Sequence, residues 1–372
     1  MNSFKLILMA ALWLGTIHQS AAARYRLTDL GDLPGGDNSS VALGLSEDGR
    51  FVVGRSSSDA GQRAFLWHNG NMMNLGTLEG THNYSEARGV NNARQVVGTS
   101  LIEDVNGGQS GNRPFLYTNG SMQNLGSLGG DYGFANAINQ VGQITGLSAD
   151  QHGVTHVFLY SNGNITDIGD LSGGGNYSNG YGINHQGQIA GVSVGANGDR
   201  GFLWDGGPLI DLGDLPGGNN SSRAYAINSL GQVVGESGAA GSPIGHAFVW
   251  QDGTMTDLGV LSDGSHSSYA LGINDTGMVV GKSYSDTSER AFVWDAVSGM
   301  HGLNQLLDGS GADWILLGAQ AINNLGHVVG TGITPDGFQH GFLLTPIPEP
   351  SGLVLLNLAG ITWICTRWIR LR

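Results

Sequence analysis

One phrase recurs seven times along the chain, and this internal repeat constrains the fold more than any single residue does. Copies such as AINQVGQITG and GINHQGQIAG end in a glycine, and successive closing glycines lie 44 to 49 residues apart. The closing glycines are Gly54, Gly98, Gly146, Gly191, Gly235, Gly281 and Gly330. A fixed period of this length is typical of architectures in which each repeat packs against its neighbours.

Each repeat contains four apolar runs of strand length. The recurring phrase supplies the first two, which we call a (Ile-Asn) and b (Val-Val-Gly). A Phe-Leu-Trp run, c, follows each copy, and an Asp-Leu-Gly run, d, follows c; the last copy of d, at 300–304, is degenerate. Between a and b stands an asparagine, and the residue three positions after it is usually glycine. Between c and d stand pairs such as Asn119-Gly120. These are turn signals, so the pattern predicts the antiparallel order a-b-c-d.

The order of the strands predicts how the repeats close. A d run at 25–31 precedes the first a run, and the last repeat ends with a c run at 342–345. If the first d strand completes the last blade, no sheet edge is left open at the join. Residues 24–346 number 323, or about 46 for each of seven units, which is the size of a propeller blade. We therefore predict an all-β, seven-bladed β-propeller of four-stranded antiparallel blades, with a stacked β-solenoid as the alternative.

The c runs also carry a family resemblance. AFLW at 64–67, PFLY at 114–117 and the later copies resemble the repeats of the HAF family of extracellular proteins. The resemblance extends over roughly residues 27–344. It implies an exported repeat protein and no defined activity.

The N-terminus has the features of a secretory signal peptide over residues 1–23. Lys5 supplies the positive charge, an apolar segment follows at 6–17, and small residues including Ala21 and Ala23 provide a cleavage site. A short membrane anchor is the alternative, although twelve apolar residues at 6–17 are few for a span. We therefore expect an exported protein.

The C-terminus, 347–372, contains a three-part signal. Pro348, Glu349 and Pro350 precede a mostly apolar segment at 351–366, and arginines follow it. This tail resembles the PEP-CTERM sorting signal of Gram-negative bacteria. The resemblance implies a transmembrane helix held transiently in the inner membrane, an exosortase as processing partner, and release to the cell surface or matrix of an exopolysaccharide-producing cell. An ordinary C-terminal membrane anchor is the alternative.

Charge and composition exclude several classes of function. Asp and Glu number 30 against 16 Lys and Arg, so no basic surface is available to neutralise phosphates, and we expect no nucleic-acid partner. The single cysteine, Cys365, excludes internal disulfides and CxxC metal sites. The HExxH motif is absent from the sequence, and we assign no catalytic, cofactor or metal residues. A calcium loop around Asp308, Ser310 and Asp313 is a weaker alternative, because no EF-hand-type glutamate follows.

Three sets of repeated polar and aromatic residues are better explained by structure than by chemistry. We expect the asparagines between a and b to form turns, and the aromatic residues that end c, such as Trp67 and Trp204, to pack between blades. We expect the d-strand aspartates to hydrogen-bond a neighbouring strand, since Asn74 and Asn124 replace aspartate in two copies. An acid/base role does not tolerate that replacement.

The leading functional interpretation is a non-enzymatic binding or structural propeller associated with exopolysaccharide. An extracytoplasmic polysaccharide hydrolase or lyase is the alternative, because propellers host both kinds of protein. In a four-stranded antiparallel blade, the b-c and d-a connections share one end, and they vary in length and carry aromatic residues. Aromatic rings among small polar groups suit stacking on sugars, so we predict the ligand face at Tyr84, Tyr132, Tyr177 and Tyr269.

Overall fold

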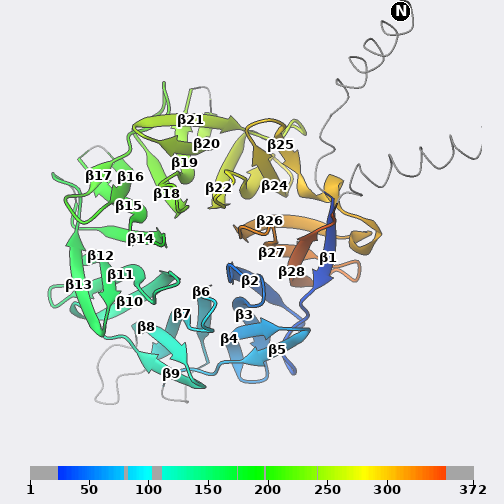
Figure 1. The fold of residues 1–372 in the computed structure, drawn as a ribbon, viewed down its shortest axis with the longest axis horizontal. Coiled ribbons are helices and arrows are strands. Elements are labelled where there is room, and N and C mark those ends of the chain that lie inside the picture. Colours follow the sequence, from blue (N-terminus) through cyan, green and yellow to red (C-terminus); the bar gives the residue numbers. More distant parts are fainter. Residues whose placement is uncertain are drawn as a thin grey trace, which may run out of the picture.

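The computed structural model describes residues 24–78, 83–102, 111–173, 175–196, 198–240 and 242–348. Seven four-stranded antiparallel sheets radiate from a central axis, and the chain returns to its starting point (Figure 1). The prediction of a seven-bladed, all-β propeller is confirmed. The predicted signal peptide with Ala21 and Ala23, and the Glu349, Pro350 and helix portions of the sorting signal, lie outside the described residues.

Each of the first six sheets uses consecutive strands, numbered from the inside of the ring outwards. Blade 1 contains β2 (Ser40–Leu45), β3 (Val52–Ser58), β4 (Gly61–His68) and β5 (Asn71–Asn74). Blade 2 contains β6 (Ser85–Val90), β7 (Val96–Ile102), β8 (Gly111–Thr118) and β9 (Ser121–Asn124). Blade 3 contains β10 (Gly129–Ile138), β11 (Ile144–Asp150), β12 (Thr155–Ser161) and β13 (Asn164–Gly169).

The next three blades repeat this order. Blade 4 contains β14 (Ser178–Ile183), β15 (Ile189–Gly195), β16 (Gly198–Trp204) and β17 (Ile210–Asp211). Blade 5 contains β18 (Ser222–Ile227), β19 (Val233–Ala239), β20 (Ser242–Gln251) and β21 (Thr254–Gly259). Blade 6 contains β22 (Ser267–Ile273), β23 (Val279–Tyr284), β24 (Glu289–Asp295) and β25 (Gly299–Gly302). The degenerate copy of d therefore still forms an outer strand.

The seventh blade joins the two ends of the ring. It contains β26 (Ile315–Ile322), β27 (Val328–Ile333) and β28 (Gln339–Pro346), and its outer strand is β1 (Tyr25–Asp29). β1 pairs antiparallel with β28, from Tyr25 opposite Pro346 to Asp29 opposite Phe342. Two short 3₁₀ helices, η1 (Leu303–Leu306) and η2 (Gly309–Gly311), precede the blade. Closure by the N-terminal strand is therefore confirmed.

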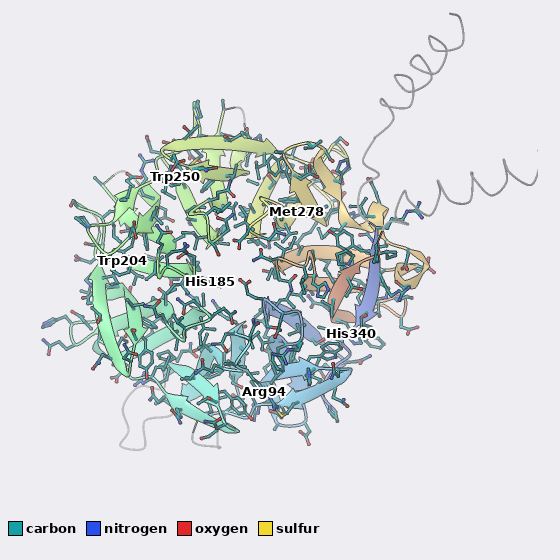
Figure 2. The ribbon with its side chains drawn as sticks, in the orientation of Figure 1. Arg94, His185, Trp204, Trp250, Met278 and His340 are labelled. Atoms are coloured by element: carbon teal, nitrogen blue, oxygen red, sulfur yellow. The ribbon has the colours of Figure 1, made fainter. Side chains whose placement is uncertain are left out.

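The core consists of seven apolar layers between adjacent blades. One phenylalanine from each c strand is fully buried: Phe65, Phe115, Phe158, Phe202, Phe248, Phe292 and Phe342. In blades 1 to 6 an aromatic residue two positions later packs against one of these layers, as Trp204 and Trp250 do at the periphery of the ring (Figure 2). The packing interpretation of these aromatic residues is confirmed.

A serine on the innermost strand fastens each of five blades to the preceding one. In these five blades, a serine at the start of the a strand makes two hydrogen bonds to the preceding blade: it donates to the carbonyl of the glycine that ends the d run and accepts from a backbone N–H of the c strand. In blade 4, for example, Ser178 Oγ donates to Gly169 O at 2.5 Å and accepts from Val157 N at 2.9 Å. These buried hydroxyls satisfy backbone groups that the sheets leave unpaired.

The repeated asparagines hold the a-b turns, as predicted, and they also join neighbouring blades. Asn184 is buried; its Oδ1 accepts from the backbone N–H groups of Gln186 and Gln188, at 3.1 and 3.0 Å. Its Nδ2 donates to the backbone oxygen of Asn228 in the next blade, at 3.1 Å. The same link runs from Asn91 to Asn139, Asn139 to Asn184, Asn228 to Asn274, Asn274 to Asn323 and Asn323 to Ser46. This chain of bonds also crosses the join between the chain's ends.

Replacing Asn184 by alanine should lower the free energy of unfolding by about 2–3 kcal/mol, because buried backbone groups lose their partners. Asn184→Ser, which copies Ser46 of blade 1, should cost less, because a hydroxyl can hold the turn without the inter-blade bond. Urea denaturation of residues 24–348 measures both changes. Asn119→Gly, in an exposed c-d turn at φ 53°, is the control and should change stability little. Equal losses for Asn184→Ala and Asn119→Gly would contradict the inter-blade role.

Candidate functional site

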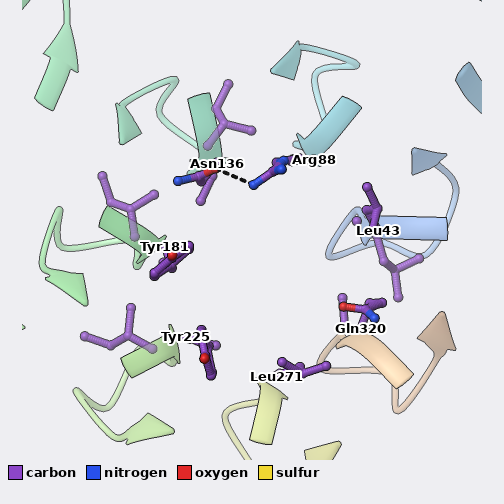
Figure 3. A pocket seen from close by; sticks show the side chains of 18 of the residues that line it. Leu43, Arg88, Asn136, Tyr181, Tyr225, Leu271 and Gln320 are labelled. Atoms are coloured by element: carbon purple, nitrogen blue, oxygen red, sulfur yellow. Dashed lines mark hydrogen bonds between the residues drawn. The ribbon is translucent and has the colours of Figure 1, made fainter. Parts of the chain in front are cut away.

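A β-bulge in every inner strand turns one side chain toward the central axis. In every blade the pairing of a with b shifts register between two small residues, as between Ala87 and Gly89 in blade 2, and this leaves the residue between them unpaired. These bulge residues are Leu43, Arg88, Asn136, Tyr181, Tyr225, Leu271 and Gln320 (Figure 3).

The closing glycine of each repeat makes this geometry possible. A Cβ at Gly98 would overlap the backbone oxygen of Glu86, two residues before the bulge residue Arg88, and the six other closing glycines face the equivalent oxygen. Only glycine allows the bulged strand to approach its partner this closely. The repeated glycine and the inward side chain are therefore parts of one feature.

The bulge residues line a cavity of about 300 Å³, together with Arg55 and Glu86. We call it the tyrosine mouth; it opens at the end of the ring that carries the d-a and b-c connections. Below the bulge residues lies a ring of aliphatic side chains: Leu45, Val90, Ile138, Ile183, Ile227, Ile273 and Ile322. Beyond this ring, on the a-b turn side, is a second cavity of about 120 Å³, where His185 lies near the axis (Figure 2).

The wall of the tyrosine mouth has a polar half and a more apolar half. Blades 2 to 5 contribute Arg88, Asn136, Tyr181 and Tyr225 in succession. Blades 6, 7 and 1 contribute Leu271, Gln320 and Leu43. Because the backbone frame repeats, this asymmetry comes from the side chains at one position. A ligand in the mouth would therefore meet hydrogen-bonding groups on one side and mainly hydrocarbon on the other.

A buried carboxylate organises the polar half. The Glu86 side chain is 1% exposed and lies between Arg88, whose Nε is 2.6 Å from its Oε1, and Arg55, which bonds its Oε2. Burial raises the pKa of the Glu86 carboxyl, but attraction to Arg88 and Arg55 and the hydrogen bonds that they donate outweigh it, so the pKa lies below its ordinary value. Glu86 is therefore held as an anion.

Arg88 is fixed from three sides. Besides its bond to Glu86, its Nη1 donates to Asn136 Oδ1 at 2.9 Å, and its guanidinium lies 5.5 Å from the centre of the Phe134 ring. Asn136 in turn donates to Asn179 Oδ1 and Gly180 O, both at 2.8 Å. Since these bonds occupy the Asn136 amide, Asn136 positions Arg88.

Blade 5 carries a second buried network. Tyr225 Oη donates to Glu236 Oε1 at 2.7 Å, and Arg223 Nη1 contacts the same oxygen at 3.0 Å. Burial and the negative charge of Glu236 raise the pKa of the Tyr225 hydroxyl, and burial raises that of Tyr181. Both hydroxyls are therefore protonated at neutral pH and can act only as neutral hydrogen-bonding groups.

The four tyrosines predicted as a ligand face are not among the residues that line this cavity, but they lie near residues that line it or contact its lining. Tyr84 Oη lies 3.4 Å from Glu86 Oε2. Tyr132, the most exposed at 43%, packs edge-on against Phe134. Burial, with a smaller contribution from the nearby Tyr177, raises the pKa of Tyr132 and of Tyr181. Tyr269 packs on Tyr284, with the Lys282 ammonium 5.9 Å from its ring centre. The structure thus gathers these tyrosines at one end of the ring, together with Tyr181 and Tyr225.

The d-strand aspartates make local bonds as well as the predicted bonds to a neighbouring strand. Asp167 Oδ1 accepts from Gly169 N at 2.8 Å, and Asp29, Asp211, Asp257, Asn74 and Asn124 accept the equivalent bond. In three blades the ring of a c-strand histidine also lies within hydrogen-bond distance of this aspartate; His156 Nδ1, for example, is 3.0 Å from Asp167 Oδ2. The substitution of asparagine for aspartate is explained by the first bond, which needs only an oxygen.

The suggested calcium loop is occupied by protein contacts. Asp308 caps η2 by accepting from Ser310 N, and Ser310 Oγ accepts from Leu27 N at 2.8 Å. Over the described ranges, no group of three His, Cys, Asp or Glu residues could hold a metal ion.

No helix within those ranges is long and apolar enough to cross a membrane.

The bulge residues were not among the predicted site residues, although the sequence contains a signal for them. In each a run, one large, variable residue stands between two small ones: Leu in ALG, Arg in ARG, Asn in ANA, Tyr in GYG and AYA, and Gln in AQA. The variable position within a constant frame marks the position available for function. The blades therefore differ at this inward position as well as in the length of their loops.

No protein-family model matches the chain, and no curated protein matches it in sequence. Solved structures with a similar arrangement include TolB from Acinetobacter baumannii (10% identity, covering 88% of this chain and 97% of that one, TM-score 0.44). A protein assigned as TolB from Agrobacterium tumefaciens matches at 12% identity, over 83% and 91% of the two chains, with a TM-score of 0.42. Dipeptidyl peptidase 4 from Porphyromonas gingivalis matches at 9% identity over 85% of this chain and 59% of its own, with a TM-score of 0.41. Likenesses this distant carry no argument about function.

Replacing Glu86 by glutamine should lower the free energy of unfolding by about 3 kcal/mol at pH 7, because two arginines lose a buried anion. The pKa of Glu86 is depressed in the folded state, so its stabilisation is present above the ordinary glutamate pKa of about 4.3 and is lost as the pH falls through the lower folded value. The difference between wild type and Glu86→Gln should therefore shrink below about pH 4. Denaturant unfolding from pH 7 to pH 3 measures it, with the exposed Asp205→Asn as control. A difference independent of pH would contradict the ion-pair account.

Proposed function

We propose that this protein is an exported, non-enzymatic propeller that binds an extracellular polysaccharide at the tyrosine mouth. The observation that carries the proposal is a cavity of about 300 Å³ that Tyr181 and Tyr225 line, with further tyrosines such as Tyr84 and Tyr132 beside its lining residues. Flat rings with polar edges suit sugars, which present C–H faces and hydroxyl rims. The volume is at the lower end of the roughly 300–1,000 Å³ range of small-molecule sites, which suits one or two sugar units of a longer chain.

The state of the carboxylates supports binding over catalysis. A general acid or base must exchange a proton near the working pH. Glu86 is held as an anion by two arginines, and Glu236 is bonded by Tyr225 and Arg223. A hydrolase or lyase reaction would have to release one of these groups first. Depolymerisation of a polysaccharide by purified residues 24–348 would overturn the non-enzymatic part of the proposal.

The two ends of the sequence support the proposed location. The signal-peptide features of 1–23 would direct export, and the PEP-CTERM-like tail would hold the protein in the inner membrane until an exosortase releases it. The mature propeller would then reside at the surface or in the matrix of a Gram-negative cell, where polysaccharide is its partner.

Alanine at Tyr132, Tyr177 or Tyr269 should each weaken glycan binding by about threefold to tenfold, because each removes an aromatic contact. A glycan array followed by calorimetry on residues 24–348 measures the effect. The matched controls are Asn69→Gly, Asn119→Gly and Asn162→Gly, in exposed turns at the opposite end of the ring, which should bind as wild type does. Loss of binding in the controls alone would place the site at the other end.

Replacing Glu349 by alanine should keep the protein in the membrane fraction of an exosortase-containing host, because the Pro-Glu-Pro motif is the expected recognition element. Immunoblots of membrane and medium measure the distribution. Asp336→Ala, an exposed carboxyl within the propeller, is the control and should be released normally. Equal release of all three proteins would contradict exosortase processing.

A further inference from the structure

We infer that the sugar bound at the tyrosine mouth is acidic and that Arg88 binds its carboxylate. This inference rests on the proposed function and refines it, because it names the chemical class of the ligand. It is carried by three features of the mouth: its local charge, the hydrogen-bonding groups that Arg88 leaves free, and the division of the wall into polar and apolar halves.

The cavity is locally positive in a strongly acidic protein. The chain has a formal net charge of −14. The cavity wall nevertheless contains two guanidinium groups, Arg55 and Arg88, and one carboxylate, Glu86, so it has one positive charge in excess. An acidic polymer would be repelled by most of the surface and attracted here, which would direct it to the mouth.

Arg88 has donors to spare and little freedom to move. Glu86, Asn136 and the Phe134 ring hold its Nε, its Nη1 and one face of its guanidinium. Its Nη2 has no hydrogen-bond partner among the described residues, and the side chain is 35% exposed. A planar carboxylate matches the geometry of guanidinium N–H groups, and a group that is already positioned loses little entropy on binding.

The rest of the wall fits the other faces of a sugar ring. Tyr181, next to Asn136 along the polar half, offers a protonated hydroxyl to sugar oxygens. Leu271 and Leu43, across the mouth, offer hydrocarbon to the C–H face of the ring (Figure 3). A uronic acid residue combines one carboxylate edge with such a face, whereas a neutral sugar would leave the Arg88 donors unused.

The test compares each acid with its own ester. Tetrasaccharides of galacturonate, mannuronate and guluronate are titrated by calorimetry into residues 24–348, which contain all 28 strands of the ring, each beside its methyl ester. The ester keeps the ring and hydroxyls but loses the charge. At least one acid should bind about tenfold or more tightly than its ester, and its affinity should fall as salt is added.

Two variants assign the effect to Arg88. Arg88→Gln should weaken binding of the acid by about 10- to 100-fold and leave ester binding unchanged. Arg88→Lys keeps the charge that Glu86 needs, so it preserves the fold if Arg88→Gln does not, and should lose part of the preference for the acid. Arg94→Gln, an exposed arginine on the a-b turn side, is the matched control and should bind as wild type does.

The outcomes separate this inference from the proposed function. Equal affinity for acid and ester, or an acid preference that survives both Arg88 variants, overturns the inference and leaves polysaccharide binding intact. Absence of binding to these acids, to their esters and to every neutral glycan on the array overturns both.

Discussion

The hydrogen bond from one turn asparagine to the next blade is the interaction on which the ring depends. Each such asparagine is buried. Its amide oxygen accepts hydrogen bonds from the backbone of its own turn, and its amide nitrogen donates one to the backbone of the next blade, as at Asn184. Because the acceptor belongs to the next blade, the bond sets the spacing of the inner strands around the axis. The bond from Asn323 to Ser46 extends the same spacing across the join, where β1 and β28 also pair.

The residues that build the repeated backbone of the blades are different from the residues that give the cavity its chemistry. The closing glycine, the two small residues of each bulge and the buried phenylalanine occupy equivalent positions in all the blades. The residue between the small ones is unpaired and points to the axis, so it can vary without disturbing a strand pair. Arg88 and Leu271 thus occupy equivalent backbone positions and give opposite sides of the mouth different chemistry.

The charges of the mouth favour recognition because they are already partnered within the protein. Glu86 is nearly inaccessible between Arg55 and Arg88, and Tyr225 donates to Glu236. Buried pairs of this kind hold side chains in one arrangement. What remains for a ligand is a set of positioned donors and ring faces, which is what the proposed binding of a polar ligand with apolar faces requires.

The sequence by itself determined the seven blades, the antiparallel strand order, the turn asparagines and the closure by the N-terminal strand. These features follow from local signals, such as Asn119-Gly120, repeated at a constant interval. It also indicated the end of the ring where Tyr132 and Tyr177 lie, because antiparallel order fixes which connections share an end. Only the tertiary structure decided that Arg88, Asn136 and Tyr181 meet, and that Glu86 of blade 2 pairs with Arg55 of blade 1. Those contacts join residues of different repeats through the bulge and the curvature of the ring, and no local pattern in the sequence encodes that curvature.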